Sequence, residues 1–173
     1  NHVTIRESVT INAATYDGDF TTVGDHGHIM AYAHIAHDCH VGNRVIMANN
    51  ATLAGHVIVE DQSILGGLTA VHQFVRIGRL SITGGCSKVV KDIPPFMMAD
   101  GNPLGVHMIN KVGLERAGVG EDTQRALKEA YKIIYRKNLN VAAALEAMDQ
   151  LAASPELEHL KAFIRGSERG ITR

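Results

Sequence analysis

A repeat of six residues runs without interruption from Val23 to Pro94, and it constrains the fold more than any other feature of the chain. The series reads VGDHGH, IMAYAH, IAHDCH, VGNRVI, MANNAT, LAGHVI, VEDQSI, LGGLTA, VHQFVR, IGRLSI, TGGCSK and VVKDIP. The first position of each hexad is apolar with one exception, and the fifth is mostly small or β-branched. Helices and strands repeat at 3.6 and 2 residues, so a period of six fits neither as a plain element.

Hexapeptide periodicity is the signature of a parallel β-helix, in which each short strand directs one apolar residue inward and a turn bends the chain to the next strand. We therefore predict a mainly β protein, a left-handed parallel β-helix with three strands of six residues in each coil. Glycine recurs at the second position, where a tight turn favours a residue without Cβ. These glycines are Gly24, Gly42, Gly66, Gly78 and Gly84.

The period ends at Pro94-Pro95, because proline cannot donate a hydrogen bond to a strand ladder. We predict two domains, a β-helix over residues 1–95 with a loop insertion near 12–22, and a connection with a helical subdomain over 96–173. In the second domain, residues 96–103 should lead out as extended chain.

Three helices are predicted beyond this connection. The first begins near Asp122, a possible N-cap, and ends at about Asn138, with apolar residues at helical spacing. Asn140 and Ser154-Pro155 are typical starts of two further helices.

Composition excludes several classes of function. The net charge of −1 gives no general argument for nucleic-acid binding, and no apolar run approaches the roughly 18 residues of a membrane span. Cys39 and Cys86 show no disulfide spacing, which favours a reducing cytoplasm. The chain begins at Asn1 and runs directly into repeat-like sequence, so we expect that N-terminal coils of the natural protein precede it.

Coils of eighteen residues place positions eighteen apart in columns, at the strand spacing of about 4.8 Å. His37, Gly55 and Gln73 form one such column. The next residues along the chain form a second column, and two more histidines lie near the same edge. These additional residues are Asp38, His56 and Phe74, with His34 and His72.

The chemistry of this group points to acyl transfer. An imidazole such as His37 can act as a general base near neutral pH, and a carboxylate on its far nitrogen fixes the tautomer and stabilises the charge that forms. The N–H of Gly55, one coil away and free of side-chain obstruction, could donate to a developing oxyanion. Base, orienting carboxylate and oxyanion donor form an acyl-transfer site without a protein nucleophile.

At this point the chain resembles the UDP-N-acetylglucosamine O-acyltransferases, which begin lipid A synthesis. The resemblance extends over almost the whole chain, through IRESVTI, AHIAHDCHVGNR, ANNATLAGHV, GGLTAVHQF, IGRLSITGGCS, DIPP, ADGNP, GLERAG, AYKIIYR and SERGITR. It implies a homotrimer with sites between subunits, which moves an (R)-3-hydroxyacyl group from acyl carrier protein to the 3-hydroxyl of UDP-N-acetylglucosamine. It implies no metal and no organic cofactor.

The resemblance also implies roles for individual residues. His37 is the general base, Asp38 its partner and the N–H of Gly55 the oxyanion donor. The substrate-binding side chains are those of His34, His56, His72, Gln73, Asn110 and Arg116, and Gly85 is the position that limits acyl length. An acidic carrier protein requires a basic surface, for which we expect Arg76, Arg79, Lys88 and Lys91.

The chain departs from the family in two places. It lacks further N-terminal coils and a loop with an Asp and a Lys that contact the donor or the sugar nucleotide. After the VTI strand, many members have His-Arg-Gly-Thr, where this chain has Asn12-Ala13-Ala14-Thr15.

Alternative functions remain at this level. Another hexapeptide-repeat acyltransferase would share the hexads. A γ-carbonic-anhydrase-like enzyme would bind zinc through three histidines at a trimer interface, for which His34, His37 and His56 are the candidates. A catalytically silent scaffold would be favoured only if His37 or Gly55 were replaced.

Overall fold

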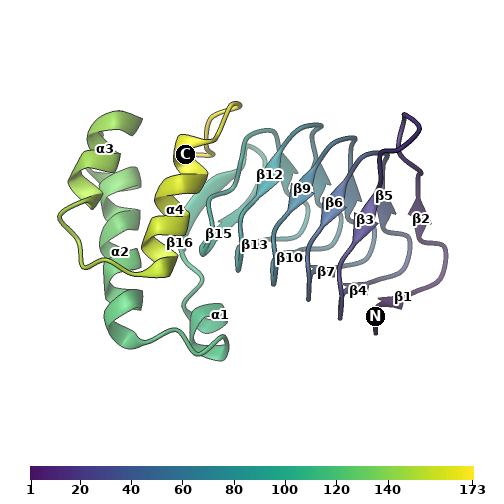
Figure 1. The fold of residues 1–173 in the computed structure, drawn as a ribbon, viewed down its shortest axis with the longest axis horizontal. Coiled ribbons are helices and arrows are strands. Elements are labelled where there is room, and N and C mark those ends of the chain that lie inside the picture. Colours follow the sequence, from purple (N-terminus) through teal and green to yellow (C-terminus); the bar gives the residue numbers. More distant parts are fainter.

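The computed structural model describes residues 1–173, and the chain winds into a left-handed parallel β-helix with helices gathered at its C-terminal end (Figure 1). The predicted fold class is therefore confirmed. The strands are β1 Thr4–Ile5, β2 Thr10–Ile11, β3 Thr22–Val23, β4 His28–Ile29, β5 His34–Ile35, β6 His40–Val41, β7 Ile46–Met47, β8 Thr52–Leu53, β9 Ile58–Val59, β10 Ile64–Leu65, β11 Ala70–Val71, β12 Arg76–Ile77, β13 Ile82–Thr83, β14 Lys88–Val89, β15 Met97–Asp100 and β16 Gly105–Ile109. The helices are α1 Lys111–Arg116, α2 Glu121–Arg136, α3 Val141–Met148 and α4 Pro155–Arg165.

The strands form three sheets, named A, B and C in the order in which each coil meets them. Sheet A contains β1, β4, β7, β10, β13, β15 and β16; sheet B contains β2, β5, β8, β11 and β14; sheet C contains β3, β6, β9 and β12. Ile64 pairs with Ile46 on one side and with Ile82 on the other, which confirms the coil of eighteen residues.

The first coil is longer than the others. Thr10 pairs with His34, 24 positions further along, whereas Thr22 pairs with His40 at the regular distance of eighteen. The extra residues therefore lie between β2 and β3, in the segment 12–21. This places the predicted loop at the turn from sheet B to sheet C.

Three columns of turns connect the sheets. We name them the A–B corner (residues 30–33, 48–51, 66–69 and 84–87), the B–C corner (36–39, 54–57 and 72–75) and the C–A corner (24–27, 42–45, 60–63 and 78–81). The fourth residue of every hexad from His26 to Cys86 turns the corner with φ between 54° and 63°. None of these residues is β-branched, which agrees with the steric cost of this conformation.

The second-position glycines serve a different purpose from the predicted one. None of them has a positive φ. They are required because neighbouring coils approach closely: a Cβ on Gly24 would lie 2.7 Å from the carbonyl carbon of Gly42, and one on Gly78 would lie 2.3 Å from the nitrogen of Pro95. The glycines thus permit contact between coils, and the non-glycine fourth position makes the turn.

The core is the inside of the β-helix. The leading residue of each hexad is the second residue of a strand and points inward; Ile29, Met47 and Leu65, for example, are fully buried. Burying one such side chain stabilises the fold by about 1.5–3 kcal/mol. The first strand residue points outward instead, so chemistry-bearing side chains in these positions remain accessible.

The C-terminal region matches part of the prediction. Helices α3 and α4 begin after Asn140 and Ser154, whose side chains accept hydrogen bonds from Ala143 N–H and Leu157 N–H as N-caps. The N-cap of helix α2 is Gly120, two residues before the predicted Asp122, so Asp122 lies in the first turn of the helix. No helix combines the length and the hydrophobicity needed to cross a membrane.

The segment after Pro95 differs from the extended connection that we predicted. Strand β15 joins sheet A in parallel to β13, and β16 then pairs with β15 in the antiparallel direction. Helix α1 follows and lies beside the coils (Figure 1). The sheet therefore continues past the two prolines, since Met97 and Ala99 point into the core.

Candidate functional site

The site is built at the B–C corner, where His37 projects from the turn after β5. Its side chain is 46% exposed, so the imidazole faces outward. The ring lies over Gly55 in the next coil: a Cβ on Gly55 would be 2.6 Å from Cε1 and 2.7 Å from Nε2 of His37. Glycine at this position therefore makes room for the imidazole.

Asp38 is the fourth residue of its hexad and turns the corner with φ 59°. It is buried, and its Oδ2 lies 2.7 Å from Nδ1 of His37. In the other coils the N–H of the fourth residue donates to a carbonyl of the preceding coil, as His56 N–H does to His37. The loop 12–21 interrupts this ladder, and Asp38 N–H donates to Oγ1 of Thr21 at 2.8 Å instead.

The same loop supplies a second residue, Thr15, that forms hydrogen bonds with the His37–Asp38 pair. Thr15 donates its hydroxyl to Oδ2 of Asp38 at 2.6 Å, and its N–H lies 3.1 Å from Oδ1. The Thr15 hydroxyl oxygen is also 3.0 Å from Nδ1 of His37. The hydrogen bond from Thr15, followed by that from His37, lowers the pKa of Asp38 from its ordinary value of 3.8 to about 2. Asp38 is therefore ionised at every pH at which the protein would work.

A second imidazole completes the cluster. Nε2 of His56 lies 3.6 Å from Oδ2 of Asp38, and the His56 ring stands perpendicular to that of His37 with centroids 5.2 Å apart. Phe74 stacks on the other side of His56 at 4.7 Å. Phe74 thus fixes the plane of the His56 ring and leaves its edge facing Asp38.

His37, Asp38 and His56 are also the group with the spacing of metal ligands, with ligand atoms within 4.8 Å of one another. This set holds Asp38 in place of the His34 of the predicted zinc alternative, and Nδ1 of His34 lies instead 2.7 Å from Oγ1 of Thr10. Ligand atoms around tetrahedral zinc with bonds of 2.0–2.1 Å are about 3.3 Å apart. The 2.7 Å between His37 and Asp38 is a hydrogen bond, so the cluster is arranged for proton transfer.

The N–H of Gly55 makes no hydrogen bond within the chain. Gln73, the next residue in the same column, forms none with its side chain either. His72 lies beside it and is exposed, with Nδ1 3.2 Å from the carbonyl oxygen of Gln73. The B–C corner therefore brings together a base, a carboxylate, an unused backbone donor and further polar side chains.

Asn110 and Arg116 lie elsewhere, over sheet A. Asn110 is buried: Nδ2 donates to the carbonyl of Leu80 at 2.8 Å, and Oδ1 caps helix α1. Both residues line a cavity of about 220 Å³ together with Arg44 and Gln62 of the C–A corner. Within one chain they are thus on a different corner from His37.

Gly85 lies at the A–B corner and is exposed. A Cβ at this position would meet only the carbonyl oxygen of Gly67, at 3.3 Å. The residue therefore leaves open space along this corner.

The predicted site residues are distributed over all three corners, so a single chain does not bring them together.

The predicted basic surface is divided in two. Arg76 packs on the Phe163 ring of α4 at 4.3 Å and donates to the carbonyl of Gly166 at 3.1 Å, so it holds the C-terminal segment against the coils. Lys88 and Lys91 instead line a cavity of about 330 Å³ with Arg173.

Lys91 lies in the last coil, where the spacing falls from eighteen residues between Val71 and Val89 to sixteen between Ile77 and Ile93, so the column of His37 and Gly55 does not extend to it. Arg79 is partly buried near the C–A corner. Of the four predicted docking residues, Arg76 is the one that shares a cavity, of about 530 Å³, with His56 and Phe74 of the acyl-transfer cluster.

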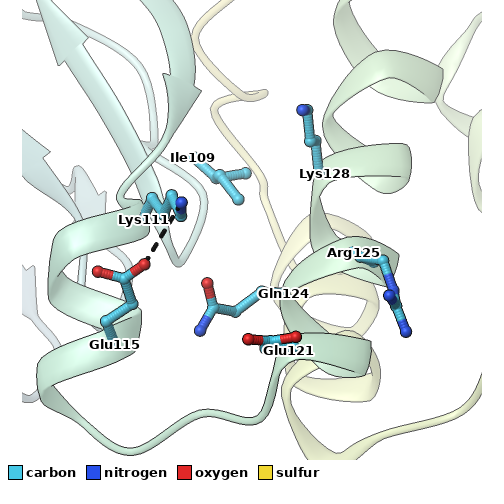
Figure 2. Close-up of a pocket in the computed structure, with 7 residues that line it drawn as sticks. All are labelled: Ile109, Lys111, Glu115, Glu121, Gln124, Arg125 and Lys128. Carbon is cyan, nitrogen blue, oxygen red and sulfur yellow. Dashed lines mark ion pairs between the residues drawn. The ribbon is translucent and has the colours of Figure 1, made fainter.

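A further cavity of about 340 Å³ lies between α1 and α2 (Figure 2). Lys111 of α1 is paired with Glu115 at 3.5 Å, and Glu121, Gln124 and Lys128 of α2 line the other side of the cavity. Acidic and basic side chains alternate around this space. It offers neither the reactive groups nor the single-sign charge of a substrate site.

Thr15 and Thr21 contact Asp38 although the sequence predicts no role for them in the site. Both belong to the loop, which has no period and hence no assigned direction for its side chains. One signal was present: the break in register between β2 and β3 places the loop at the corner next to His37. Thr15 also matches the last residue of the His-Arg-Gly-Thr motif.

Coils built from hexads define a class of protein, the bacterial hexapeptide-repeat transferases. Residues 20–55 match the family described as bacterial transferase hexapeptide (six repeats), and residues 92–172 match that described as Udp N-acetylglucosamine O-acyltransferase, domain 2. The chain belongs to the UDP-N-acetylglucosamine O-acyltransferase family. The predicted resemblance is confirmed.

Three relatives illustrate the match. An acyl-[acyl-carrier-protein]–UDP-N-acetylglucosamine O-acyltransferase of Verminephrobacter eiseniae is 49% identical over 98% of this chain and 67% of its own length. The protein of the same description from Synechocystis is 45% identical over 94% of this chain and 59% of its own. The structure of LpxA from Acinetobacter baumannii superposes with a TM-score of 0.95 at 40% identity, over 100% of this chain and 68% of that one. The chain thus spans about two thirds or less of the length of these relatives.

Proposed function

We propose that the protein is an acyltransferase that moves an (R)-3-hydroxyacyl group from acyl carrier protein to the 3-hydroxyl of UDP-N-acetylglucosamine, the first step of lipid A synthesis. The printed names of the relatives support the two substrates. The observation that carries the proposal is the His37–Asp38 pair beside the unused N–H of Gly55.

The reaction follows from these groups. Nε2 of His37 takes the proton of the sugar 3-hydroxyl as its oxygen attacks the thioester carbonyl. The N–H of Gly55 donates to the oxyanion of the tetrahedral intermediate, and Asp38 stabilises the imidazolium. Collapse of the intermediate breaks the C–S bond, and the leaving thiolate takes the proton from His37. No acyl-enzyme forms, because the sugar hydroxyl is itself the nucleophile.

The assembly that we propose is a cyclic homotrimer with three equivalent sites between subunits. It is supported by the separation of the candidate residues within one chain. The B–C corner carries His37, whereas the cavity with Asn110 and Arg116 lies over sheet A. A neighbouring chain that sets its sheet A against the B–C corner would bring the nucleotide-binding side chains to the base.

The remaining binding roles follow the same arrangement. His34, His56, His72 and Gln73 would contact the substrates at the B–C corner. Gly85 would border the acyl chain at the A–B corner, where a larger side chain would shorten the groove.

Arg76, Arg79, Lys88 and Lys91 would bind the acidic carrier protein, and the cavity that Arg76 shares with His56 supports its part in this surface. The proposed location is the cytoplasm, where free thiols such as those of Cys39 and Cys86 stay reduced.

The test is an assay of purified protein with UDP-N-acetylglucosamine and hydroxyacyl carrier proteins of several chain lengths. Mass spectrometry should detect UDP-3-O-acyl-N-acetylglucosamine with one preferred length. Absence of this product with every donor, from protein that is folded and trimeric, would contradict the proposed activity of this chain.

A further inference from the structure

We propose that Thr15 is a positioning residue that directs the Asp38 carboxylate to His37 and thereby keeps the proton of the neutral imidazole on Nδ1. The proposal rests on the proposed function of His37 as the base. It concerns the loop 12–21, whose role neither the hexads nor the comparisons assign.

The hydrogen positions follow from the contacts. An ionised carboxylate only accepts hydrogen bonds, so the 2.6 Å contact between Thr15 and Asp38 uses the single hydroxyl proton of Thr15. The Thr15 oxygen, 3.0 Å from Nδ1 of His37, is then an acceptor there. Oδ2 of Asp38, 2.7 Å from the same nitrogen, is an acceptor as well. Two acceptors at Nδ1 require the proton at that atom, which leaves the lone pair on Nε2.

Asp38 has a choice of partner that makes this positioning necessary. Its Oδ2 lies 2.7 Å from Nδ1 of His37 and 3.6 Å from Nε2 of His56, so a small rotation would pair it with the second imidazole. Thr15 opposes this rotation because its hydroxyl and its N–H both bind the carboxylate. Without these bonds, Asp38 would be shared between His37 and His56.

The fold explains why a loop supplies this residue. At the other turns, the N–H of the fourth residue already donates to a backbone carbonyl of the preceding coil. In the first coil, the extra residues open the B–C corner directly beside His37. Thr21 replaces the missing carbonyl acceptor for Asp38, and Thr15 reaches the carboxylate.

The experiment compares Thr15→Val, which keeps the shape without the hydroxyl, with Thr15→Ser, which restores the hydroxyl. Thr22→Val is the matched control, because Thr22 lies 3.0 Å from Nδ1 of His40 in a similar Thr–His pair with no carboxylate. The ring nitrogens of histidine in the full-length protein are observed by ¹⁵N NMR, with the His37 signals assigned from His37→Gln.

In the wild type, the neutral His37 ring should carry its proton on Nδ1. Thr15→Val should mix the two tautomers and lower kcat by roughly 10-fold, less than the 10²- to 10⁴-fold contribution of the base itself, with KM for both substrates unchanged. Thr15→Ser should restore the tautomer and most of kcat, and Thr22→Val should change neither.

A wild-type proton on Nε2, an unchanged tautomer in Thr15→Val, or a Thr15→Ser variant as impaired as Thr15→Val would overturn the proposal. The NMR result decides the role of Thr15 without reference to turnover. A lack of acyl transfer by the wild type would instead count against the proposed function.

Discussion

The B–C and C–A corners have the same backbone conformation, and they differ in whether side chains accept hydrogen bonds from their backbone N–H groups. At the C–A corner, the side-chain oxygen of Asn43 accepts a hydrogen bond from Asp25 N–H at 2.8 Å, and that of Asp61 accepts one from Asn43 N–H at 2.7 Å. Each side chain therefore satisfies the backbone donor of the preceding coil. At the B–C corner, Gln73 occupies the place that would cover Gly55 N–H, and it forms no such bond.

This difference shows how a repeat becomes a site. At the C–A corner, the short side chains of Asn43 and Asp61 at the third position of the hexad form a structural ladder. At the B–C corner, glycine and glutamine at the same position leave the donor of Gly55 free, and His37 adds a base beside it. Between these two corners the scaffold is constant, and the third position distinguishes the one that contributes stability from the one that contributes chemistry.

The largest effect is expected from His37→Ala, which removes the proposed base. Turnover should fall about 10²- to 10⁴-fold, because this is the usual contribution of general-base catalysis. The trimer and its thermal stability should remain, since the imidazole points outward. His40→Ala, in the next outward position, is the control; a His37→Ala variant that kept more than half of the wild-type kcat would show that another group is the base.

The second change converts one corner into the other. Gln73→Asn would place a short amide at the third position, as Asn43 does at the C–A corner, and its oxygen should accept from Gly55 N–H. Loss of an oxyanion donor lowers kcat about 10²- to 10³-fold. A crystal structure of the variant should show the new hydrogen bond. If the bond forms and kcat is unchanged, Gly55 is not the oxyanion donor.

The opposite change opens the C–A corner. Asn43→Ala removes the acceptor for Asp25 N–H and a donor to Asp61, at 3.3 Å from each of its oxygens. The free energy of unfolding should fall by about 0.5–1.5 kcal/mol, the usual net value of a hydrogen bond. Denaturant unfolding measures this change, and kcat should stay the same. A loss of activity at wild-type stability would contradict the division between the two corners.

The smallest effect concerns pH. The pKa of Asp38 is lowered from 3.8 to about 2 by Thr15 and His37, so its contribution to loop docking is fully present above about pH 4 and is lost as the pH falls toward 2. Hydrogen exchange of Thr15 N–H, corrected for the intrinsic rate, should show constant protection from pH 8 to about 4 and weaker protection below it. In Asp38→Asn this dependence should disappear.

Much of the fold and part of the candidate site could be predicted from the sequence, because the hexad has a fixed period. Leading residues such as Ile29 and Met47 identify the core, and positions eighteen apart place His37 above Gly55. The fourth position could not be recognised as the turning residue, because it holds histidine, leucine and phenylalanine rather than glycine.

Regions without a period were less predictable. Thr15 reaches Asp38 through an irregular loop, so no spacing gives its direction. Strand β15 follows two prolines, which indicate the end of a strand ladder. Sheet A nevertheless continues, because Met97 and Ala99 are buried at the end of the core. Tertiary packing determined both the position of Thr15 and the continuation of sheet A.

The central claim is that the active site is divided between the B–C corner of one chain and the sheet A face of another. Its most direct test is co-expression of His37→Ala and Arg116→Ala chains, each inactive or severely impaired by itself. In random mixed trimers, about a quarter of the sites would combine an intact His37 with an intact Arg116 from the neighbour. Acyl-transfer activity near that fraction of the wild type is predicted; mixed trimers no more active than the two separate variants would contradict a shared site.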